Sequence, residues 1–359
     1  LLYELKGEKL NDFSLDIPEA ENLPDFLVEL KYELDWMLKM QDEDGGVYHK
    51  VNTINFPGMI FPDDDNQMRY IYEKGTTDTA IFAGAMACAY RAFKDIKPEY
   101  SAKLAEAAIK AGEFLLNNDV MWPSNDNTGE YKSSSLVDEL YWAYAELFRL
   151  TGRKDFYEEA ELMNQLIDGI PPFSWDDTTL LAIHAMIKAE DTPDKLRGKL
   201  ETLILSEARK IVKRVEDNGY WVALDDSEYY WASNKVTLAH GLSLILANEL
   251  YPDRDFIDAA RRQLDYILGI NSISKSFITD IGTDRVRYPH HRLIQAGGKI
   301  VPGLMVGGPN DNAEDGLYQQ GLKQGGYVDM FEAYSCNEYA IDYNAPLVFL
   351  AGYFMDEQL

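Results

Sequence analysis

The sequence predicts an all-α protein. Helical periodicity recurs along most of the 359 residues, alternating strand patterns are few, and Gly, Pro, Asn and Asp mark the connections. Hydrophobic residues make up 46% of the chain, which is enough to build a sizeable core. Because the helices follow one another in pairs, they suit a helical bundle or toroid of antiparallel hairpins.

The first long helix is predicted to begin at Pro24, because proline suits the first turn of a helix. Leu27, Leu30, Leu34 and Leu38 then share one face. The next helix is rich in Ala and Gly, a composition that allows close helix packing. The predicted ranges from there on are 78–93, 101–116, 135–151, 155–168, 177–189, 194–215, 234–250, 255–267 and 338–354.

Two long segments, 41–76 and 268–333, interrupt the helical pattern with many Gly and Pro residues. Irregular segments of this length within a compact domain are usually functional. No linker composition separates them from the helices. The sequence therefore predicts one domain over residues 1–359.

Charge excludes several classes of partner. The chain has 34 Lys and Arg against 61 Asp and Glu, a net charge of −27. Such a chain repels nucleic acid, anionic membranes and polyanionic substrates, and its apolar runs are too short to span a bilayer.

The two cysteines, Cys88 and Cys336, are expected to be buried thiols and cannot form a disulfide scaffold. The 23 Tyr and 6 Trp suit a core, and they also suit a cleft that stacks on sugar rings.

Two clusters of polar residues lie in or beside the second irregular segment. His290 and His291 lie between Pro289 and Arg292, which gives a donor-rich group suited to sugar hydroxyls or to a structural role. The second cluster extends from Tyr327 to Asn344 and contains several aromatic residues and carboxylates. Taken alone, Glu338 in this cluster could be a first-turn acid favoured by the helix dipole.

The segment from Tyr327 to Ala345 resembles the C-terminal active-site signature of glycoside hydrolase family 9, which includes many bacterial and plant endoglucanases. The segment from Ser276 to Arg292 is similar to the family's other signature, although it departs at Asp284 and at 285–288. Four shorter fragments also match in order, and they lie at 45–50, 138–143, 301–303 and 307–310. The resemblance covers nearly the whole chain.

The resemblance implies an (α/α)6 barrel, here apparently without its first helix, and an inverting hydrolase. Glu338 takes the position of the general acid, which must stay protonated near the working pH. Asp329 and His290 complete the expected catalytic set. The expected substrate-binding residues are Arg292, Tyr343, Tyr334, Trp231 and Asp177.

An inverting mechanism also needs a carboxylate base, about 6.5–9.5 Å from the acid. The family's base belongs to an Asp-Ala-Gly-Asp segment, and this sequence contains none. The chain is therefore expected to be the C-terminal portion of a longer catalytic domain. The upstream fragment is expected to carry the base and is a candidate second chain. The 359 residues alone could then be inactive.

A structural calcium site is a further implication of the resemblance. The expected ligands are Ser134, Asp138, Glu139 and Asp176, whose hard oxygen atoms suit Ca²⁺. The alternative is that the serines and acids cap the first turn of a helix. No cofactor is expected to take part in the chemistry itself.

The leading functional prediction is an inverting endo-β-1,4-glucanase, acting on cellulose-like or mixed-linkage glucan outside the cell or in a bacterial periplasm. Two alternatives stay open. One is an exo-β-glucosaminidase on chitosan oligosaccharides, because an acidic cleft suits a cationic sugar. The other is a glycan-binding remnant without catalysis.

Overall fold

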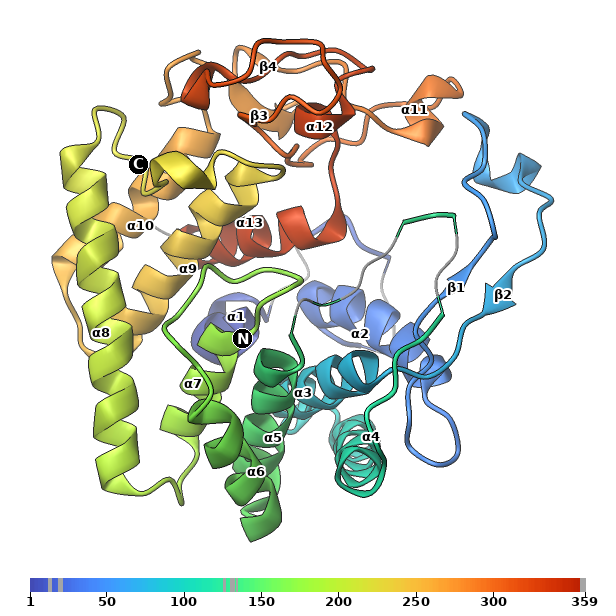
Figure 1. The fold of residues 1–359 in the computed structure, drawn as a ribbon, viewed down its shortest axis with the longest axis vertical. Helices are drawn as coiled ribbons and strands as arrows, with labels where there is room; N and C mark the ends of the chain where they lie inside the picture. Colours follow the sequence, from blue (N-terminus) through green and yellow to red (C-terminus); the bar gives the residue numbers. More distant parts are fainter. Residues whose placement is uncertain (12–14, 19–21, 125–126, 130–132, 134, 356–359) are drawn as a thin grey trace. The chain divides into compact units, whose positions relative to one another are not determined.

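The computed structural model describes residues 1–359 except 12–14, 19–21, 125–126, 130–132, 134 and 356–359. Helices dominate the described chain (Figure 1). They are α1 (Leu2–Lys6), α2 (Asp25–Met37), α3 (Thr76–Phe93), α4 (Pro98–Asn117), α5 (Val137–Thr151), α6 (Lys154–Asn164), α7 (Thr179–Lys188), α8 (Asp194–Asp217), α9 (Ser233–Leu250), α10 (Arg254–Ile267), α11 (Arg292–Gln295), α12 (Tyr334–Asn337) and α13 (Ile341–Phe354).

Strands are few and short within the described residues. Strand β1 (Val51–Asn52) pairs antiparallel with β2 (Tyr70–Ile71), and β3 (Ser276–Thr279) pairs parallel with β4 (Arg285–Val286). In register, Val51 lies opposite Ile71 and Ser276 opposite Arg285. The short 3₁₀ helices are Gly7–Lys9, Leu38–Met40, Pro62–Asp64, Asp226–Glu228 and Lys323–Gly325. The all-α prediction is confirmed.

The described chain forms two compact units. Unit 1 comprises residues 1–56, 68–171 and 176–200, and unit 2 comprises 57–67, 172–175 and 201–359. In unit 1, α3 packs against α4 and α5, and α5 packs against α6 and α7 (Figure 1). In unit 2, α9 packs against α10 and α13. Short connections between successive helices are typical of antiparallel hairpins.

Small residues bring α3 and α5 together in unit 1, as the sequence predicts. Ala80, Ala83 and Ala87 are fully buried. A Cβ atom on Gly84 would lie 2.7 Å from the Trp142 ring, so only glycine permits this approach. In unit 2, every residue of α9 from Ser233 to Ala247 is buried. A helix that is buried on all sides is an interior helix.

The ten long helices are found close to their predicted ranges, with one informative error. The last helix begins at Ile341 and not at Glu338. Glu338 has extended backbone (φ −87°, ψ 158°), because this segment pairs with other extended segments of unit 2. The alternative of a first-turn acid is therefore wrong. Pairing with distant segments also produced the short strands, which local periodicity does not reveal.

Both cysteines are free. Cys336 is buried as predicted, whereas Cys88 is partly exposed. Among the residues that the structure describes, no helix is both long and apolar enough to cross a membrane.

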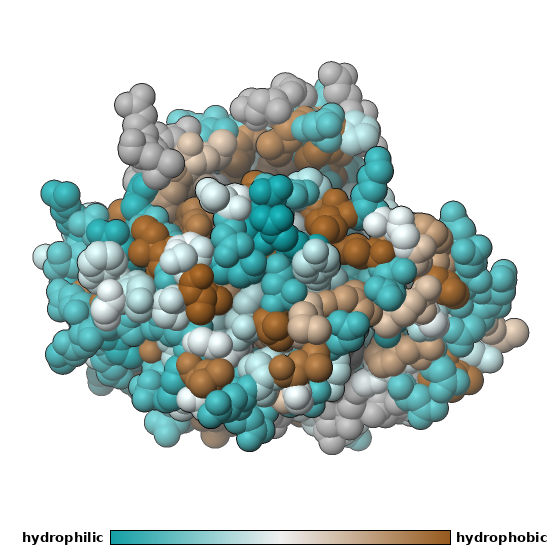
Figure 2. All heavy atoms as spheres, turned by 90° about the horizontal axis from the view of Figure 1, so that it is seen from above, coloured by the Kyte–Doolittle hydropathy of each residue, from teal (hydrophilic) through white to brown (hydrophobic). Residues whose placement is uncertain are grey.

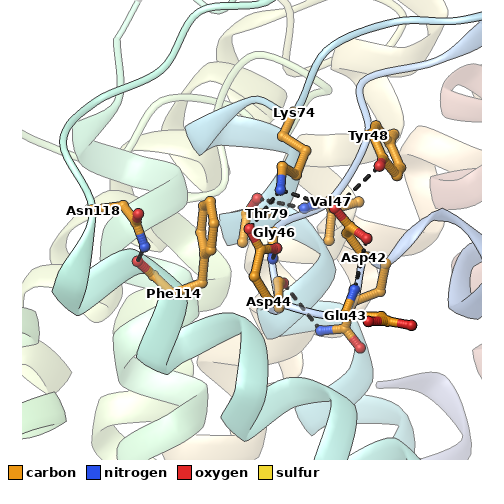
Figure 3. A network of polar contacts seen from close by, with 12 residues as sticks. Asp42, Glu43, Asp44, Gly46, Val47, Tyr48, Lys74, Thr79, Phe114 and Asn118 are labelled. Carbon is orange, nitrogen blue, oxygen red and sulfur yellow. Dashed lines mark hydrogen bonds and ion pairs between the residues drawn. The ribbon is translucent and has the colours of Figure 1, made fainter.

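A tight loop in unit 1, residues 42–48, depends on two glycines, Gly45 and Gly46, and Figure 3 shows the polar contacts of this loop. Gly45 has φ +102°, and a Cβ atom there would lie 2.4 Å from the Lys110 carbonyl oxygen. Lys74 bridges the loop through ion pairs with Asp42 (3.0 Å) and Asp44 (2.5 Å). Hydrogen bonds from Lys74 lower the pKa of both carboxylates. Gly45 and the ion pairs of Lys74 therefore restrict the conformation of the loop that precedes His49.

Replacing Gly45 with alanine should destabilise unit 1. Both the positive φ and the contact with backbone oppose a side chain, so we expect G45A to lower the free energy of unfolding by about 2 kcal/mol or more. The matched control is G58A, because a Cβ atom on Gly58 would meet nothing within 4 Å, and we expect a change within about 0.5 kcal/mol. Chemical denaturation of both variants measures the difference. Equal stability of the two variants would contradict this explanation.

Candidate active site

The candidate site in unit 2 is built on an extended segment around Glu338. The backbone N–H of His290 donates to the Asn337 carbonyl, and that of Gly307 donates to the Glu338 carbonyl, both at 2.8 Å. Val306 and Tyr339 form an antiparallel bridge. Glu338 is therefore held from both sides. Figure 1 shows the loops that supply these residues gathered with β3, β4, α11 and α12 at one end of unit 2.

Two donors hold the Glu338 carboxyl. The indole Nε1–H of Trp231 lies 3.1 Å from Glu338 Oε1 and 2.9 Å from the Tyr343 hydroxyl. That hydroxyl lies 3.5 Å from the same carboxyl oxygen. Burial raises the pKa of Glu338, and Asp342 adds to the rise, whereas Trp231, His290 and Tyr343 oppose it. The net rise is the direction that a proton donor requires.

His290 lies beside the carboxyl in a defined orientation. Its Nδ1 lies 2.7 Å from the Phe331 carbonyl oxygen, which can only accept, so Nδ1 carries the proton. Its ring stacks on Phe331 at 4.8 Å and meets the edge of Tyr334 at 6.0 Å. The rings of Trp231 and Tyr334 are 5.7 Å apart. Four predicted residues, Glu338, His290, Trp231 and Tyr334, thus form one cluster, and Tyr343 adjoins it.

Asp329, the other carboxylate of the expected catalytic set, is surrounded by hydrogen-bond donors. Its carboxylate accepts from the backbone N–H groups of Arg287 and Tyr288, both at 2.9 Å. It also pairs with Lys275 at 3.1 Å and accepts from Asn337 Nδ2 at 3.3 Å. Four donors therefore hold the Asp329 side chain in one place. The geometry therefore favours a positioning role, in which Asp329 fixes the loop before His290, and gives no support for proton transfer.

The remaining predicted residue of unit 2 is Arg292, which begins α11. Its Nε donates to the Pro57 carbonyl at 3.3 Å. Aromatic side chains from several loops reach the surface of this unit, with Tyr288 62%, Tyr230 41% and Tyr334 38% exposed. Figure 2 shows, on the face seen from above, small groups of apolar residues among polar ones. Exposed aromatic rings on polar loops are suited to stacking on sugars.

Unit 1 contains the predicted acidic residues. Ser133 Oγ donates to Glu139 Oε1 and lies 3.4 Å from Asp176 Oδ1, which links these two carboxylates. Asp138 instead accepts from the Thr178 backbone N–H at 2.9 Å. Ser134 lies outside the described residues. No group of three or more His, Cys, Asp or Glu side chains within the described part of the chain is arranged to hold a metal.

Burial perturbs the acids of this cluster strongly. Desolvation raises the pKa of Glu139 to about 8, with a further contribution from Asp138. Burial, together with Asp138 and Asp176, raises the pKa of Asp177 to about 6, although Asp177 accepts from the Thr179 backbone N–H at 3.0 Å. Glu139 Oε2 is buried without a hydrogen-bond partner among the described residues. Burial and the neighbouring acids therefore oppose the ionisation of Glu139 and Asp177.

Sequence reasoning missed two pairs. In unit 1, His49 Nδ1 lies 2.8 Å from Asp78 Oδ1, and the other oxygen of Asp78 is buried without a partner in the described structure. The signal was an acid in the first turn of α3 and a His in the Gly-rich fragment. In unit 2, Lys235 pairs with Asp342 at 3.2 Å. Its signal was a lysine in the first turn of a helix whose one other Lys, Arg, Asp or Glu residue is Glu249, near its end.

Comparison with known proteins identifies the family. The model of glycosyl hydrolase family 9 matches residues 7–351. Endoglucanase D of Acetivibrio thermocellus is 33% identical over 369 aligned positions, which cover 98% of this chain and 57% of that protein. A xyloglucan-specific endo-beta-1,4-glucanase of Bacteroides ovatus is 34% identical, with 98% and 64% covered.

Solved structures agree. The crystal structure of a metagenome-derived family 9 endoglucanase superposes with a TM-score of 0.94 at 38% identity, covering 98% of this chain and 66% of that one. The chain thus spans about three-fifths of the length of the two curated relatives. It belongs to glycosyl hydrolase family 9 and has the (α/α)6 fold of that family.

Proposed function

We propose that this chain carries the acid half of an inverting glycoside hydrolase site that cleaves β-1,4-linked glucan. The observation that supports this most directly is the half-buried carboxyl of Glu338. Its pKa is raised, and it is held by Trp231 and Tyr343 in one place. The family membership and the names of the relatives, which include endoglucanases and a xyloglucanase, support the substrate class.

In the proposed reaction, Glu338 donates its proton to the glycosidic oxygen as the bond to the leaving sugar breaks. Burial keeps the carboxyl protonated before the transfer. The indole and phenol donors then stabilise the carboxylate that forms, because both bond to Glu338 Oε1. His290 and Arg292 would hold hydroxyls of the sugar at the scissile bond, and exposed Tyr334 would stack on a ring.

The second half of an inverting site is a carboxylate that activates water on the opposite face of the sugar. The base is assigned only by the family resemblance, to an Asp-Ala-Gly-Asp segment that the 359 residues do not contain. We propose that a fragment carrying this segment is a partner of the chain. Asp177, whose pKa is raised to about 6, is proposed only as a substrate-binding residue.

We further propose that the acidic cluster of unit 1 binds calcium. Glu139 and Asp176, already linked through Ser133, would supply carboxylate oxygens, with Asp138 beside them and Ser134 adjacent in sequence. Glu139 Oε2 has no hydrogen-bond partner among the residues that the structure describes, which favours a hard cation at this place. Bound calcium would hold this cluster together and take no part in glycoside cleavage.

The location proposed for the protein is outside the cell or in a bacterial periplasm. A polymeric glucan is too large to enter a cell intact. The names of the bacterial endoglucanase relatives support this placement.

Replacing Glu338 with Gln should abolish turnover and leave glycan binding intact. In the presence of a fragment that carries the Asp-Ala-Gly-Asp segment, we expect E338Q to lower the rate on cello-oligosaccharides by about 10²-fold or more relative to the wild type, because the amide cannot donate the proton. The wild-type rate should fall as pH rises through the raised pKa of Glu338. The matched control, E332Q, alters an exposed acid nearby and should keep wild-type activity.

Product release from cellotetraose, with binding measured calorimetrically, distinguishes the outcomes. Full activity of E338Q would exclude Glu338 as the acid. Binding without turnover in the wild-type chain, even with an Asp-Ala-Gly-Asp fragment added, would instead support the glycan-binding remnant.

Calcium should stabilise the chain more at high pH than at low pH. Glu139 must lose a proton to bind the ion, and its pKa is raised to about 8, so affinity should increase as pH rises toward 8. At a calcium concentration of 100 Kd the gain is about 2.7 kcal/mol. Thermal melts at pH 6 and pH 8, with calcium or with a chelator, measure this. The variant E139Q should lose the response and E106Q, at an exposed position, should keep it. No calcium response at either pH would refute the site.

A further inference from the structure

We infer that Lys235 is a positioning residue for the acid, because its ion pair with Asp342 fixes the first turn of α13 and sets the charge beside Glu338. The inference rests on the proposed function of Glu338. It concerns a residue that touches neither the carboxyl nor a reacting atom in the described contacts. Lys235 would act through Asp342 and Tyr343.

Lys235 is in an unfavourable place for a lysine. It is only 5% exposed, although lysine is almost never buried without a partner. It also lies in the first turn of α9, where the helix dipole opposes a cation. Residues in such unfavourable positions are expected at functional sites, and the cost of burying their charge must be offset by nearby contacts.

The compensation comes from α13. Lys235 Nζ lies 3.2 Å from Asp342 Oδ2, and it lies 5.8 Å from the centre of the Tyr343 ring. Asp342 is an acid in the first turn of α13, where the dipole favours it. The pair therefore ties the starts of two packed helices together. Removing one partner would leave the other charge unpaired in a largely buried place.

The ion pair is one of two connections between the start of α9 and the segment from Glu338 to Tyr343. The other connection is made by Trp231. Ala232, which has a left-handed backbone (φ 68°), is the N-cap of α9, with Trp231 before it and Lys235 in the first turn after it. Trp231 contacts the Tyr343 hydroxyl and Glu338, whereas Lys235 contacts the Tyr343 ring and Asp342. Tyr343 is thus held at both its hydroxyl and its ring.

The charges around Glu338 give this pair an electrostatic effect. The titratable groups that face the acid are His290 from the loop before α11, and Asp342 and Tyr343 from α13. Asp342 opposes ionisation of Glu338, and Lys235 partly cancels the Asp342 charge. Without Lys235, the full negative charge of Asp342 acts on the acid, whereas without Asp342 that repulsion is absent and the Lys235 cation is left unpaired.

The test is the pKa of Glu338 in three variants of the whole chain. It is measured by NMR titration of ¹³C-labelled glutamate carboxyls, with Glu338 assigned from E338Q. We expect K235M to raise this pKa by about one unit and D342N to lower it by a similar amount. The double variant K235M/D342N carries no charge at either position and should return the pKa close to the wild-type value.

The exposed pair of Lys213 and Asp217 provides the matched control, because its nitrogen–oxygen distance is 2.9 Å and its side chains are 74% and 67% exposed. K213M should leave the Glu338 pKa unchanged. The inference is overturned if the Glu338 pKa in folded K235M equals that of the wild type. It is also overturned if the double variant is shifted as far as either single variant.

If K235M does not fold, D342N and the double variant still decide the question. A double variant with the D342N pKa would then overturn the inference. Failure of the proposed function is detected separately, because turnover by E338Q contradicts the acid role whatever the titrations show.

Discussion

The candidate site depends on the extended backbone at Glu338 and Tyr339, directly after α12. Two backbone hydrogen bonds, from His290 and Gly307, hold this segment between two other segments of unit 2. If residue 338 continued the last helix instead, both hydrogen bonds would be lost. Asn344, in the first turn of α13, accepts from the Met305 backbone N–H at 2.8 Å. This bond joins the helix to the segment that contains Gly307. The acid is thus fixed by main-chain geometry before any side chain acts.

Two opposing effects then set the proton affinity of Glu338. Burial disfavours the carboxylate, and this is the largest cause of the raised pKa. The donors Trp231 and Tyr343 favour the carboxylate and limit the rise. Because burial favours the protonated form of Glu338 and the two donors favour its carboxylate, the group can hold a proton and still release it. The same donors fix the carboxyl oxygen in place, so position and acidity depend on the same contacts.

The sequence predicted the long helices well, because their periodicity is local. A family resemblance with a specific spacing also named residues that the structure places near Glu338, namely His290, Trp231, Tyr334 and Tyr343, whereas their catalytic and binding roles stay predictions. It could not show that Glu338 lies outside the last helix, since only pairing with Gly307 and His290 determines that. The contacts of Asp329 could not be predicted for a similar reason, because Arg287 and Tyr288 donate to it through backbone amides.

Proton donation by Glu338 can be tested through the leaving group. The measurement is made with a fragment that carries the Asp-Ala-Gly-Asp segment present, and it is the rate of E338A relative to wild type on cellotetraose and on a dinitrophenyl cellobioside, whose leaving group needs no proton. The account predicts a loss of about 10²-fold or more on cellotetraose and a much smaller loss on the activated substrate. Equal losses on the two substrates would contradict it and would mean that Glu338 supports the site without donating a proton.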